Sequence, residues 1–545
     1  MENFSRRQFL GRTALAVAPA LLLPHFSFGL NAEPEYKIIE TPFGKLRGFR
    51  ENGVNIFKGV PYAGNISGEK RFQKAEPVKP WTGTRDALQL GNPSIQPPNQ
   101  TYGINEPKPA EECLVLNIWT PANDGRKRPV MVYNHGGGFR TGSGGSTAQD
   151  GANLARMYDV VVVATNHRLG LSGFLYLDEI AGEEYKGSGN RGVQDIAVAL
   201  QWINENIELF GGDPANVMIF GESGGGMKTS CLYAMPEAAP FFHKASIESG
   251  PGVELMDAEN AAETTRLVLD YLNISPQNWR KLLEIPAEKL LEAQEKIPQK
   301  LNPNTLGFHG IGNSGIGSFG AVKDGFVLPE HPFDPAAPAF SKSKPLLVGW
   351  NEDEYIFFAM SGNDKEAFKL SEEMLKTRLK NEFGDKAELI FKTYKNSNPE
   401  MSPTAIYMAI RSIMFMGLGS IRIAERKSLQ NGAPVYLYNF GYKSDSKVPG
   451  TDYEFGAMHA LDIPFKFYNV DSGWPGTRPE RYIAAKNMTE LWTSFARTGR
   501  PAANTQPEWQ PYNLKSRPTF RIDVQCELIN NRFGAEREMW ETILK

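Results

Sequence analysis

One serine stands in a glycine pattern that could make it a nucleophile. The segment Gly221-Glu222-Ser223-Gly224-Gly225 has the form G-x-S-x-G, in which the serine lies on a turn so sharp that side chains beside it would clash. The apolar run 216–220 predicts the strand that enters this turn, and 224–235 predicts the helix that leaves it. Backbone N–H groups at the start of that helix would favour developing negative charge. This context favours acyl transfer by Ser223 over an idle serine in a glycine-rich turn.

A second glycine cluster could bind the negative charge that forms when a serine attacks a carbonyl. His135-Gly136-Gly137-Gly138-Phe139 follows a predicted strand that ends at Asn134, and an H-G-G-G element in this place supplies amides for an oxyanion hole. We expect the backbone N–H groups of Gly137, Gly138 and Gly224 to be the donors. A phosphate-binding loop is the competing interpretation, but the glycine-rich stretch 136–145 lacks the Gly-Lys-Ser/Thr ending of such loops.

The base of the site should come late in the chain, because the order in folds with this elbow is serine, acid, histidine. Four histidines follow the serine: His243, His309, His331 and His459. The first comes too early to leave room for an acid on a later strand. The next two lie in loops rich in Gly and Pro with no strand leading into them. His459 comes after the apolar run 435–440 and is the candidate base.

The acid should follow directly after a strand. The apolar run 345–349 leads into three carboxylates: Glu352, Asp353 and Glu354. Position alone does not choose among these three side chains.

These residues need a scaffold of strands that end at one edge. Apolar runs predict strands at 129–134, 160–165, 216–220, 245–248, 346–348 and 435–440. Helical spacing predicts helices at 193–208 and 224–235, and a final helix at 479–497. The segments 253–300 and 364–428 are rich in predicted helix and read as insertions between strands. Strands that alternate with helices indicate an α/β fold with a mostly parallel sheet.

The composition is that of a soluble globular protein with an apolar core. The chain has 545 residues, a formal net charge of −3, 41% hydrophobic residues and 22% charged residues. No basic stripe or charge block occurs, so neither nucleic acid nor an anionic membrane is an expected partner. The three cysteines, Cys113, Cys231 and Cys526, allow one disulfide at most. No metal-ligand spacing is present, and we expect neither a metal nor a cofactor.

The N-terminus has the order of an export signal. Ser5-Arg6-Arg7-Gln8-Phe9-Leu10 is a twin-arginine pattern, and an apolar run at 14–23, too short to span a bilayer, follows it. Small residues at Ser27, Gly29 and Ala32 offer cleavage points. We therefore predict a signal peptide over 1–29 and a single catalytic domain over 30–545. The mature protein would be passed through the twin-arginine export machinery, become periplasmic or secreted, and keep no stable membrane insertion.

Together these segments resemble the type-B carboxylesterases, a family that includes bacterial nitrobenzyl esterases, liver-type carboxylesterases and cholinesterases. The resemblance covers nearly the whole mature chain. The matching motifs, in order, are Glu111-Glu-Cys-Leu-Val-Leu-Asn117, His135-Gly-Gly-Gly-Phe139, Asn166-His-Arg-Leu-Gly170, Gly189-Asn-Arg-Gly192, Phe210-Gly-Gly-Asp-Pro214, Phe220-Gly-Glu-Ser-Gly-Gly225, Gly349-Trp-Asn-Glu-Asp-Glu354 and Gly456-Ala-Met-His459. Such a series in the right order is far more specific than any one pattern.

The resemblance implies an α/β-hydrolase fold and assigns roles within it. The family pattern places the acid at Glu354 and supports His459 as the base. It also implies that Ser249 helps to hold the acid and that Glu222 biases the field of the site without transferring protons. The implied reaction is hydrolysis of a carboxylic ester through an acyl-enzyme. Amides, carbamates or thioesters are the alternative substrates, and a non-catalytic binding role is disfavoured because every catalytic position is kept.

Four departures from the family pattern bear on the prediction. Gly224 stands where the family commonly has Ala, and we expect this to change little because both expose the same amide. His167 stands where the family usually has Tyr. Ser94 occupies the position whose cysteine pairs with the equivalent of Cys113 in animal members, so we expect Cys113 to be a buried free thiol. The loop 96–111 has Tyr102 as its only aromatic residue and lacks the Trp that binds choline in cholinesterases. We therefore expect neutral esters of short-to-medium acyl chains as substrates.

Overall fold

The computed structural model describes residues 35–98, 106–300, 315–471 and 473–544. The predicted export signal at 1–29 lies outside the described residues, as do Tyr102 and His309. In the described part, thirteen strands form one sheet in the order β1-β2-β3-β5-β7-β6-β8-β9-β12-β13-β16-β17, with β4 paired to β2.

The strands of this sheet are β1 (Glu35–Thr41), β2 (Gly44–Glu51), β3 (Val54–Pro61), β4 (Thr84–Asp86), β5 (Val115–Thr120), β6 (Arg128–Asn134), β7 (Val161–Thr165), β8 (Gly212–Glu222), β9 (Lys244–Glu248), β12 (Leu346–Asn351), β13 (Val435–Phe440), β16 (Pro518–Ile522) and β17 (Glu527–Asn530). Two small pairs, β10 (Met256–Asp257) with β11 (Val322–Lys323) and β14 (Ser444–Lys447) with β15 (Glu454–Gly456), stand apart from it. The α-helices are α1 (Ala152–Tyr158), α2 (Gly170–Phe174), α3 (Arg191–Asn206), α4 (Gly224–Tyr233), α5 (Ala258–Tyr271), α6 (Ala287–Lys296), α7 (Tyr355–Ser361), α8 (Glu372–Phe383), α9 (Ala387–Ser397), α10 (Pro403–Ser412), α11 (Leu418–Ser428), α12 (Asp462–Lys466), α13 (Arg481–Thr498) and α14 (Gly534–Ile543).

The middle of the sheet is parallel and its two ends are antiparallel. Strands β7, β6, β8, β9, β12, β13 and β16 pair with one another in parallel. At one end β1, β2, β3, β5 and β7 form antiparallel pairs, with β4 added to β2 in parallel, and at the other end β17 pairs antiparallel with β16. Because parallel strands are buried on both faces, they read as continuous apolar runs, which is why the sequence revealed them. The fold is that of an α/β hydrolase, as predicted.

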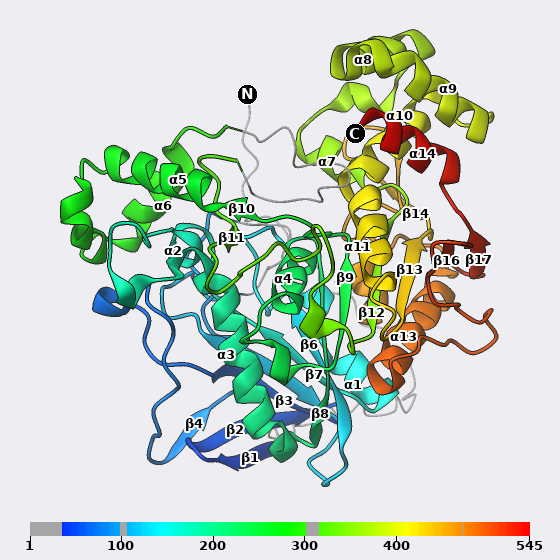
Figure 1. Cartoon of the computed structure of the whole chain (residues 1–545). Helices are drawn as coiled ribbons and strands as arrows, with labels where there is room; N and C mark the ends of the chain where they lie inside the picture. The colour runs from blue at the N-terminus through cyan, green and yellow to red at the C-terminus, as the bar shows by residue number, and fades with distance from the viewer. Residues whose placement is uncertain (1–34, 99–105, 301–314, 472, 545) are drawn as a thin grey trace, which may run out of the picture.

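Side chains of the central strands alternate between two apolar layers. On β6, Val130 and Val132 belong to one buried cluster, which includes residues of α3 and α4. Met131 and Tyr133 belong to the other cluster, which includes residues of α1 and α13. Helices thus cover both faces of the sheet, and Figure 1 shows α8, α9 and α14 grouped beyond the C-terminal strands.

The C-terminal region departs from the sequence prediction. The predicted helix at 479–497 is present as α13, but it is not the final helix, because β16, β17 and α14 follow it. Strand β17 is short and half exposed, so it carries no clear apolar pattern. One continuous helical run, Pro403–Ser428, is long and apolar enough to cross a membrane, but 78% of its apolar window is buried inside the protein. It joins α10 to α11 through a π-helical turn, η12 (Ile413–Gly417), and forms part of the core.

Candidate active site

The parallel register brings the predicted site residues to one edge of the sheet. Asn134, at the end of β6, is level with Gly221 on β8, and Glu222 is level with Glu248 on β9. The oxyanion loop, the elbow and the predicted acid therefore follow neighbouring strand ends. This is the edge at which open parallel sheets bind ligands.

Ser223 stands on a strained turn between β8 and α4. Its backbone has φ 58° and ψ −123°, a conformation that costs free energy for a residue with a side chain. The turn is crowded: a Cβ atom on Gly221 would lie 2.5 Å from the carbonyl oxygen of Asn134, and one on Gly225 would lie 1.9 Å from the same atom. The Ser223 N–H donates to the Glu248 carbonyl at 2.8 Å. Glycine on both sides is thus a steric requirement of the elbow.

The imidazole of His459 joins the serine to a carboxylate. Its Nε2 lies 2.8 Å from Ser223 Oγ and its Nδ1 lies 2.6 Å from Glu354 Oε2. With the proton on Nδ1, the ring donates to Glu354 and accepts from the serine hydroxyl. The other oxygen of Glu354 accepts from the Asn351 N–H at 2.6 Å. The structure therefore brings Ser223, His459 and Glu354 together as a hydrogen-bonded row.

The two other carboxylates after β12 serve different contacts. Glu352 pairs with Arg521 and Arg532 at 2.8 and 2.6 Å. Asp353 accepts from the Ala457 N–H at 2.8 Å, in the loop that leads to His459. Of the three candidates left open by the sequence, only Glu354 reaches the imidazole.

Glu222 lies on the other side of the same imidazole. Its Oε1 is 3.4 Å from His459 Nε2, its side chain is fully buried, and neither oxygen accepts a hydrogen bond from the described residues. Burial raises the pKa of Glu222 above its usual range. Burial alone would lower the pKa of His459, but the carboxylates of Glu222 and Glu354 outweigh it and raise that pKa. Glu222 is thus close enough to act on the imidazole through its charge, and its electrostatic role stays a prediction.

The loop 136–138, which carries the proposed oxyanion-hole amides, is in close contact with the first residue of α4. Gly137 and Gly138 have φ values of 85° and 66°, which favour glycine. A Cβ atom on Gly224 would lie 2.3 Å from the Gly138 nitrogen. The expectation that Ala in place of Gly224 would change little is therefore wrong for this structure, because the loop occupies the space of that methyl group.

Ser249 is placed near the acid but does not bind it. Its N–H donates to the Gly349 carbonyl at 2.8 Å, which fixes the backbone after β9 against β12. Its buried hydroxyl makes no hydrogen bond with the described residues. The predicted contact between this hydroxyl and Glu354 is not present in the structure.

The other histidines have structural surroundings. His243 and His331 each accept from a backbone N–H, of Val217 and Leu255 respectively. His135 and His167 are buried and stacked, with ring centroids 4.6 Å apart. Within the described ranges no three His, Cys, Asp or Glu side chains group as metal ligands would.

Aromatic residues beside His459 were missed from the sequence. Phe357 and Phe358 on α7 have ring centroids 5.6 and 4.8 Å from the imidazole. Phe415, in the π-helical turn η12, packs on Phe358 at 5.1 Å. Helical spacing of three and four residues from Glu354 could have indicated that both rings share its face.

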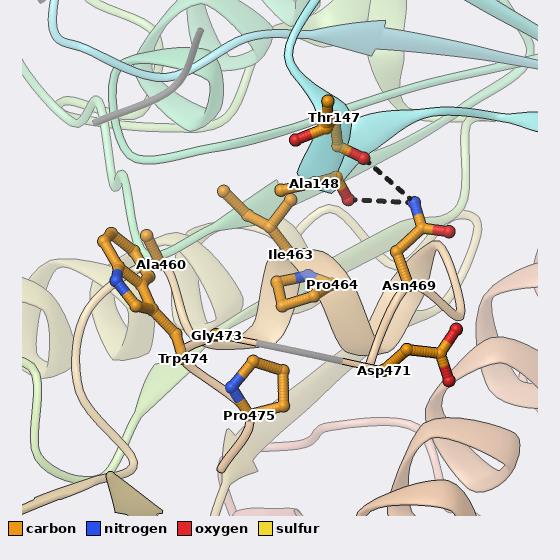
Figure 2. A pocket seen from close by; sticks show the side chains of 10 residues that line it. All are labelled: Thr147, Ala148, Ala460, Ile463, Pro464, Asn469, Asp471, Gly473, Trp474 and Pro475. Atoms are coloured by element: carbon orange, nitrogen blue, oxygen red, sulfur yellow. Dashed lines mark hydrogen bonds between the residues drawn. The ribbon is translucent and has the colours of Figure 1, made fainter. Parts of the chain in front are cut away.

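A cavity of about 430 Å³ lies next to these aromatic residues (Figure 2). Its lining comprises Thr147, Ala148, Ala460, Ile463, Pro464, Asn469, Asp471, Gly473, Trp474 and Pro475. The Asn469 side-chain amide donates to the carbonyl of Ala148 at 3.2 Å and so joins two rims of the cavity. Ala460 follows His459 directly, and the Trp474 ring lies 6.0 Å from Phe357. The cavity adjoins the row of Ser223, His459 and Glu354 without being lined by it.

Fold and site together define an α/β hydrolase with a serine, a histidine and a glutamate in line. The chain belongs to the carboxylesterase family, whose profile matches residues 35–540. It is 33% identical to the para-nitrobenzyl esterase of Bacillus subtilis over 92% of this chain and 98% of that protein. It is 31% identical to the phenmedipham hydrolase of Pseudarthrobacter oxydans, over 92% and 96% of the two chains. The crystal structure of the Geobacillus stearothermophilus carboxylesterase EST55 at pH 6.2 superposes with a TM-score of 0.78 at 36% identity, over 92% of this chain and 99% of that one. The protein is therefore a carboxylic ester hydrolase.

Proposed function

We propose that the protein is a serine esterase that hydrolyses neutral carboxylic esters through an acyl-enzyme on Ser223. The observation that carries the proposal is the position of Ser223 Oγ, 2.8 Å from His459 Nε2, while Glu354 binds the other ring nitrogen at 2.6 Å. A serine becomes nucleophilic when a base lies within hydrogen-bond reach and a third group orients that base.

The geometry supports a reaction in two halves. His459 takes the hydroxyl proton as Ser223 attacks the ester carbonyl, and Glu354 stabilises the imidazolium that forms. The N–H groups of Gly137, Gly138 and Gly224 are the proposed donors to the oxyanion, each worth about 10²–10³ in rate in a comparable site. The imidazolium then gives its proton to the departing alcohol. Water, deprotonated by the same histidine, releases the acid and restores the serine.

Replacement of the nucleophile tests the assignment. Ser223→Ala should fold and hydrolyse p-nitrophenyl butyrate at background rate, since no other described group occupies the attacking position. A fluorophosphonate probe should label the wild-type protein at Ser223 and leave the variant unlabelled. Substantial turnover by Ser223→Ala would contradict the assignment.

The leaving group is the less constrained part of the proposal. Amides, carbamates and thioesters pass through the same tetrahedral intermediate, and the row of three residues does not distinguish them. Neutral esters are proposed because the loop 96–111 contains no Trp that could bind a quaternary ammonium group. A panel of matched p-nitrophenyl esters, anilides, carbamates and thioesters compares them directly, and a kcat/KM for an anilide above that of the ester would overturn the preference.

Export is a further part of the proposal and rests on the sequence of 1–29. The pair Arg6-Arg7 before an apolar run is the pattern of twin-arginine signals, which carry folded proteins. Replacing both arginines by lysine should leave precursor in the cytoplasm, as judged by fractionation. Normal export of that variant would mean that another route is used.

A further inference from the structure

A buried ammonium group lies behind the active site. Lys466, on α12, has a side chain only 1% exposed, and its Nζ lies 2.6 Å from Glu248 Oε2 and 2.6 Å from Asp462 Oδ2. Glu248 Oε1 also accepts from Ser246 Oγ at 2.7 Å and from Trp492 Nε1 at 2.5 Å. Both carboxylates are fully buried. This is a desolvated cluster of one cation and two anions.

The cluster is joined to the acid of the active site through Asn351. The amide of Asn351 donates to Asp462 Oδ1 at 3.2 Å and to the Met458 carbonyl at 2.8 Å, in the residue before His459. The Asn351 N–H donates to Glu354 Oε1 at 2.6 Å. Asn351 therefore couples Asp462 to both partners of the acid–base pair.

The cluster is joined to the nucleophile as well. Glu248 belongs to β9, next to β8, and its carbonyl accepts the N–H of Ser223 at 2.8 Å. The side chain that binds Lys466 and the backbone that holds the elbow are thus parts of one residue. A shift of the Glu248 side chain would therefore also move the backbone carbonyl that binds the Ser223 N–H.

The charges around His459 are unbalanced without Lys466. The titratable groups that face this region from the packed elements are Glu222 (β8), Glu248 (β9), Glu354 (after β12), Tyr438 (β13), and Asp462 and Lys466 (α12). Helix α13 contributes the indole of Trp492, and α7 contributes the rings of Phe357 and Phe358. Two buried carboxyl groups, Glu222 and Glu354, lie within 4 Å of the imidazole, and Asp462 also acts on it electrostatically. Among the groups named here, Lys466 is the one buried lysine.

Buried carboxylates favour the protonated form of a nearby histidine, which cannot act as a base. A buried cation opposes them. We propose that Lys466 is a positioning residue whose charge, held by Glu248 and Asp462, keeps His459 available as the general base and fixes Glu354 through Asn351. The inference rests on the proposed function of His459.

One electrostatic direction agrees with this geometry: Asp462, which Lys466 binds, is among the groups that raise the pKa of His459. A buried ion cluster contributes little to the stability of the fold, because the cost of desolvating three charges offsets their attraction. A role in the active site would explain the cluster better than a role in stability.

The test uses two substitutions with opposite predicted signs. Lys466→Met removes the cation and keeps an apolar side chain of similar length, so the acid limb of kcat/KM should move to higher pH. Glu248→Gln keeps hydrogen-bonding groups and removes an anion, so the acid limb should move to lower pH. A unit charge several ångströms away in a medium of effective dielectric constant ~20 predicts a shift on the order of one pH unit.

The double variant Lys466→Met/Glu248→Gln removes one charge of each sign and should return the limb toward the wild-type position. It also keeps the inference testable if the single lysine variant does not fold. Lys466→Arg, which retains the charge, should stay close to the wild-type limb. The matched control is Lys427→Met, a buried lysine on α11 that donates to the carbonyls of Ser341 and Lys342 and should leave the limb unchanged.

The measurement is the pH dependence of kcat/KM for p-nitrophenyl acetate, normalised by titration of Ser223 with a fluorophosphonate. Single variants that lose activity equally at all pH values, or a double variant that does not restore the limb, would overturn the role of Lys466. Absence of labelling and turnover in the wild-type protein would instead overturn the proposed function.

Discussion

Two carboxylates flank the imidazole of His459, and only one of them shares a hydrogen bond with it. Glu354 meets Nδ1 at 2.6 Å, while Glu222 stands 3.4 Å from Nε2, on the side of the nucleophile. The first can fix the tautomer and orientation of the ring. The second can act only through its charge, since it holds no hydrogen bond to a described residue.

The difference predicts which carboxylate after β12 matters. Glu354→Gln should lower kcat by about 10⁴, because the imidazole loses its charge partner and its preferred tautomer. Glu352→Gln and Asp353→Asn should cost far less, since their contacts go to arginines and to the Ala457 N–H. Single-turnover and steady-state rates with p-nitrophenyl butyrate measure the three. A larger loss in Asp353→Asn than in Glu354→Gln would show that the acid is wrongly assigned.

Glu222 predicts a change in pH dependence. Its carboxylate raises the pKa of His459, so Glu222→Gln should lower that pKa. The base must be neutral to act, and the acid limb of kcat/KM should therefore move to lower pH. Glu352→Gln, whose carboxylate pairs with arginines, is the control and should leave the limb in place. A limb that moved upward in Glu222→Gln would contradict an electrostatic role.

At the scale of elements, the oxyanion hole depends on how α4 sits against the loop after β6. The two segments meet where Gly224 faces Gly138, with no room for a methyl group. Lys228, on the next turn of α4, reaches across and donates to the His135 carbonyl at 3.0 Å. Helix and loop are thus joined by a fully buried lysine that forms no ion pair with the described residues.

Lys228 predicts a pH-dependent stability. Burial lowers its pKa to about 7 in the folded protein, against 10.5 when exposed. Between these values the unfolded chain binds a proton that the folded chain does not, so this residue makes stability rise with pH across that window. Below the lower value the full penalty is present. Lys228→Met removes the penalty, and its free energy of unfolding relative to wild type should improve as pH falls from 10 to 7, by up to ~1.4 kcal/mol per pH unit.

Urea unfolding at pH 7, 8.5 and 10 measures this slope. The carbonyl of His135 left without its donor adds a cost that does not depend on pH, so the slope is diagnostic while the absolute difference is not. Lys392→Met, at an exposed position, is the control and should show no slope. A flat difference between Lys228→Met and wild type would mean that Lys228 does not titrate in this window. The same variant should lose kcat, because the tie to the oxyanion loop is gone.

The elements that carry the site were predictable because each obeys a local constraint. The glycines around Ser223 form a recognisable pattern because the turn brings their backbone against the loop after β6, which leaves no room for side chains. The central strands are apolar runs because both faces are covered. The features that the sequence did not predict have no such local pattern. Strand β17 is half exposed and so has no apolar run, and the ion pair of Glu248 with Lys466 joins residues 218 positions apart. Only the folded sheet brings that pair next to the strand that ends at the elbow.

At the scale of the molecule, stability rests on packing rather than on cross-links. The three cysteines are free and buried. Cys113 stands beside Ser94, as the sequence indicated, and burial raises its pKa to about 12. Thiol titration with DTNB should find no fast-reacting thiol in the native protein at pH 8 and three in the denatured, unreduced protein. A single thiol after denaturation would reveal a disulfide that these positions do not explain.

The selection of substrates also belongs to the whole molecule, because the site is built from segments far apart in sequence. Aromatic rings can bind a quaternary ammonium group through cation–π contact. The rings nearest the base, Phe357 and Phe358, pack against the imidazole itself. Trp474, the better cation binder, lines the neighbouring cavity. The loop 96–111 contains no Trp that could serve this purpose.

We therefore expect no preference for a cationic ester over its neutral counterpart. The measurement is kcat/KM for butyrylcholine against 3,3-dimethylbutyl butyrate, which has the same shape without the charge. The neutral ester should be hydrolysed at least as well, because the mature chain's predicted net charge of −5 gives cations only weak steering. Trp474→Ala tests whether the cavity contributes to any preference for the charged ester. If substrates do not use the cavity, the ratio of the two kcat/KM values should be the same in this variant as in the wild type. A clear preference for butyrylcholine that disappears in Trp474→Ala would show that the cavity in Figure 2 is a cation site, and that the absence of a Trp in the loop 96–111 was an unsafe guide to specificity.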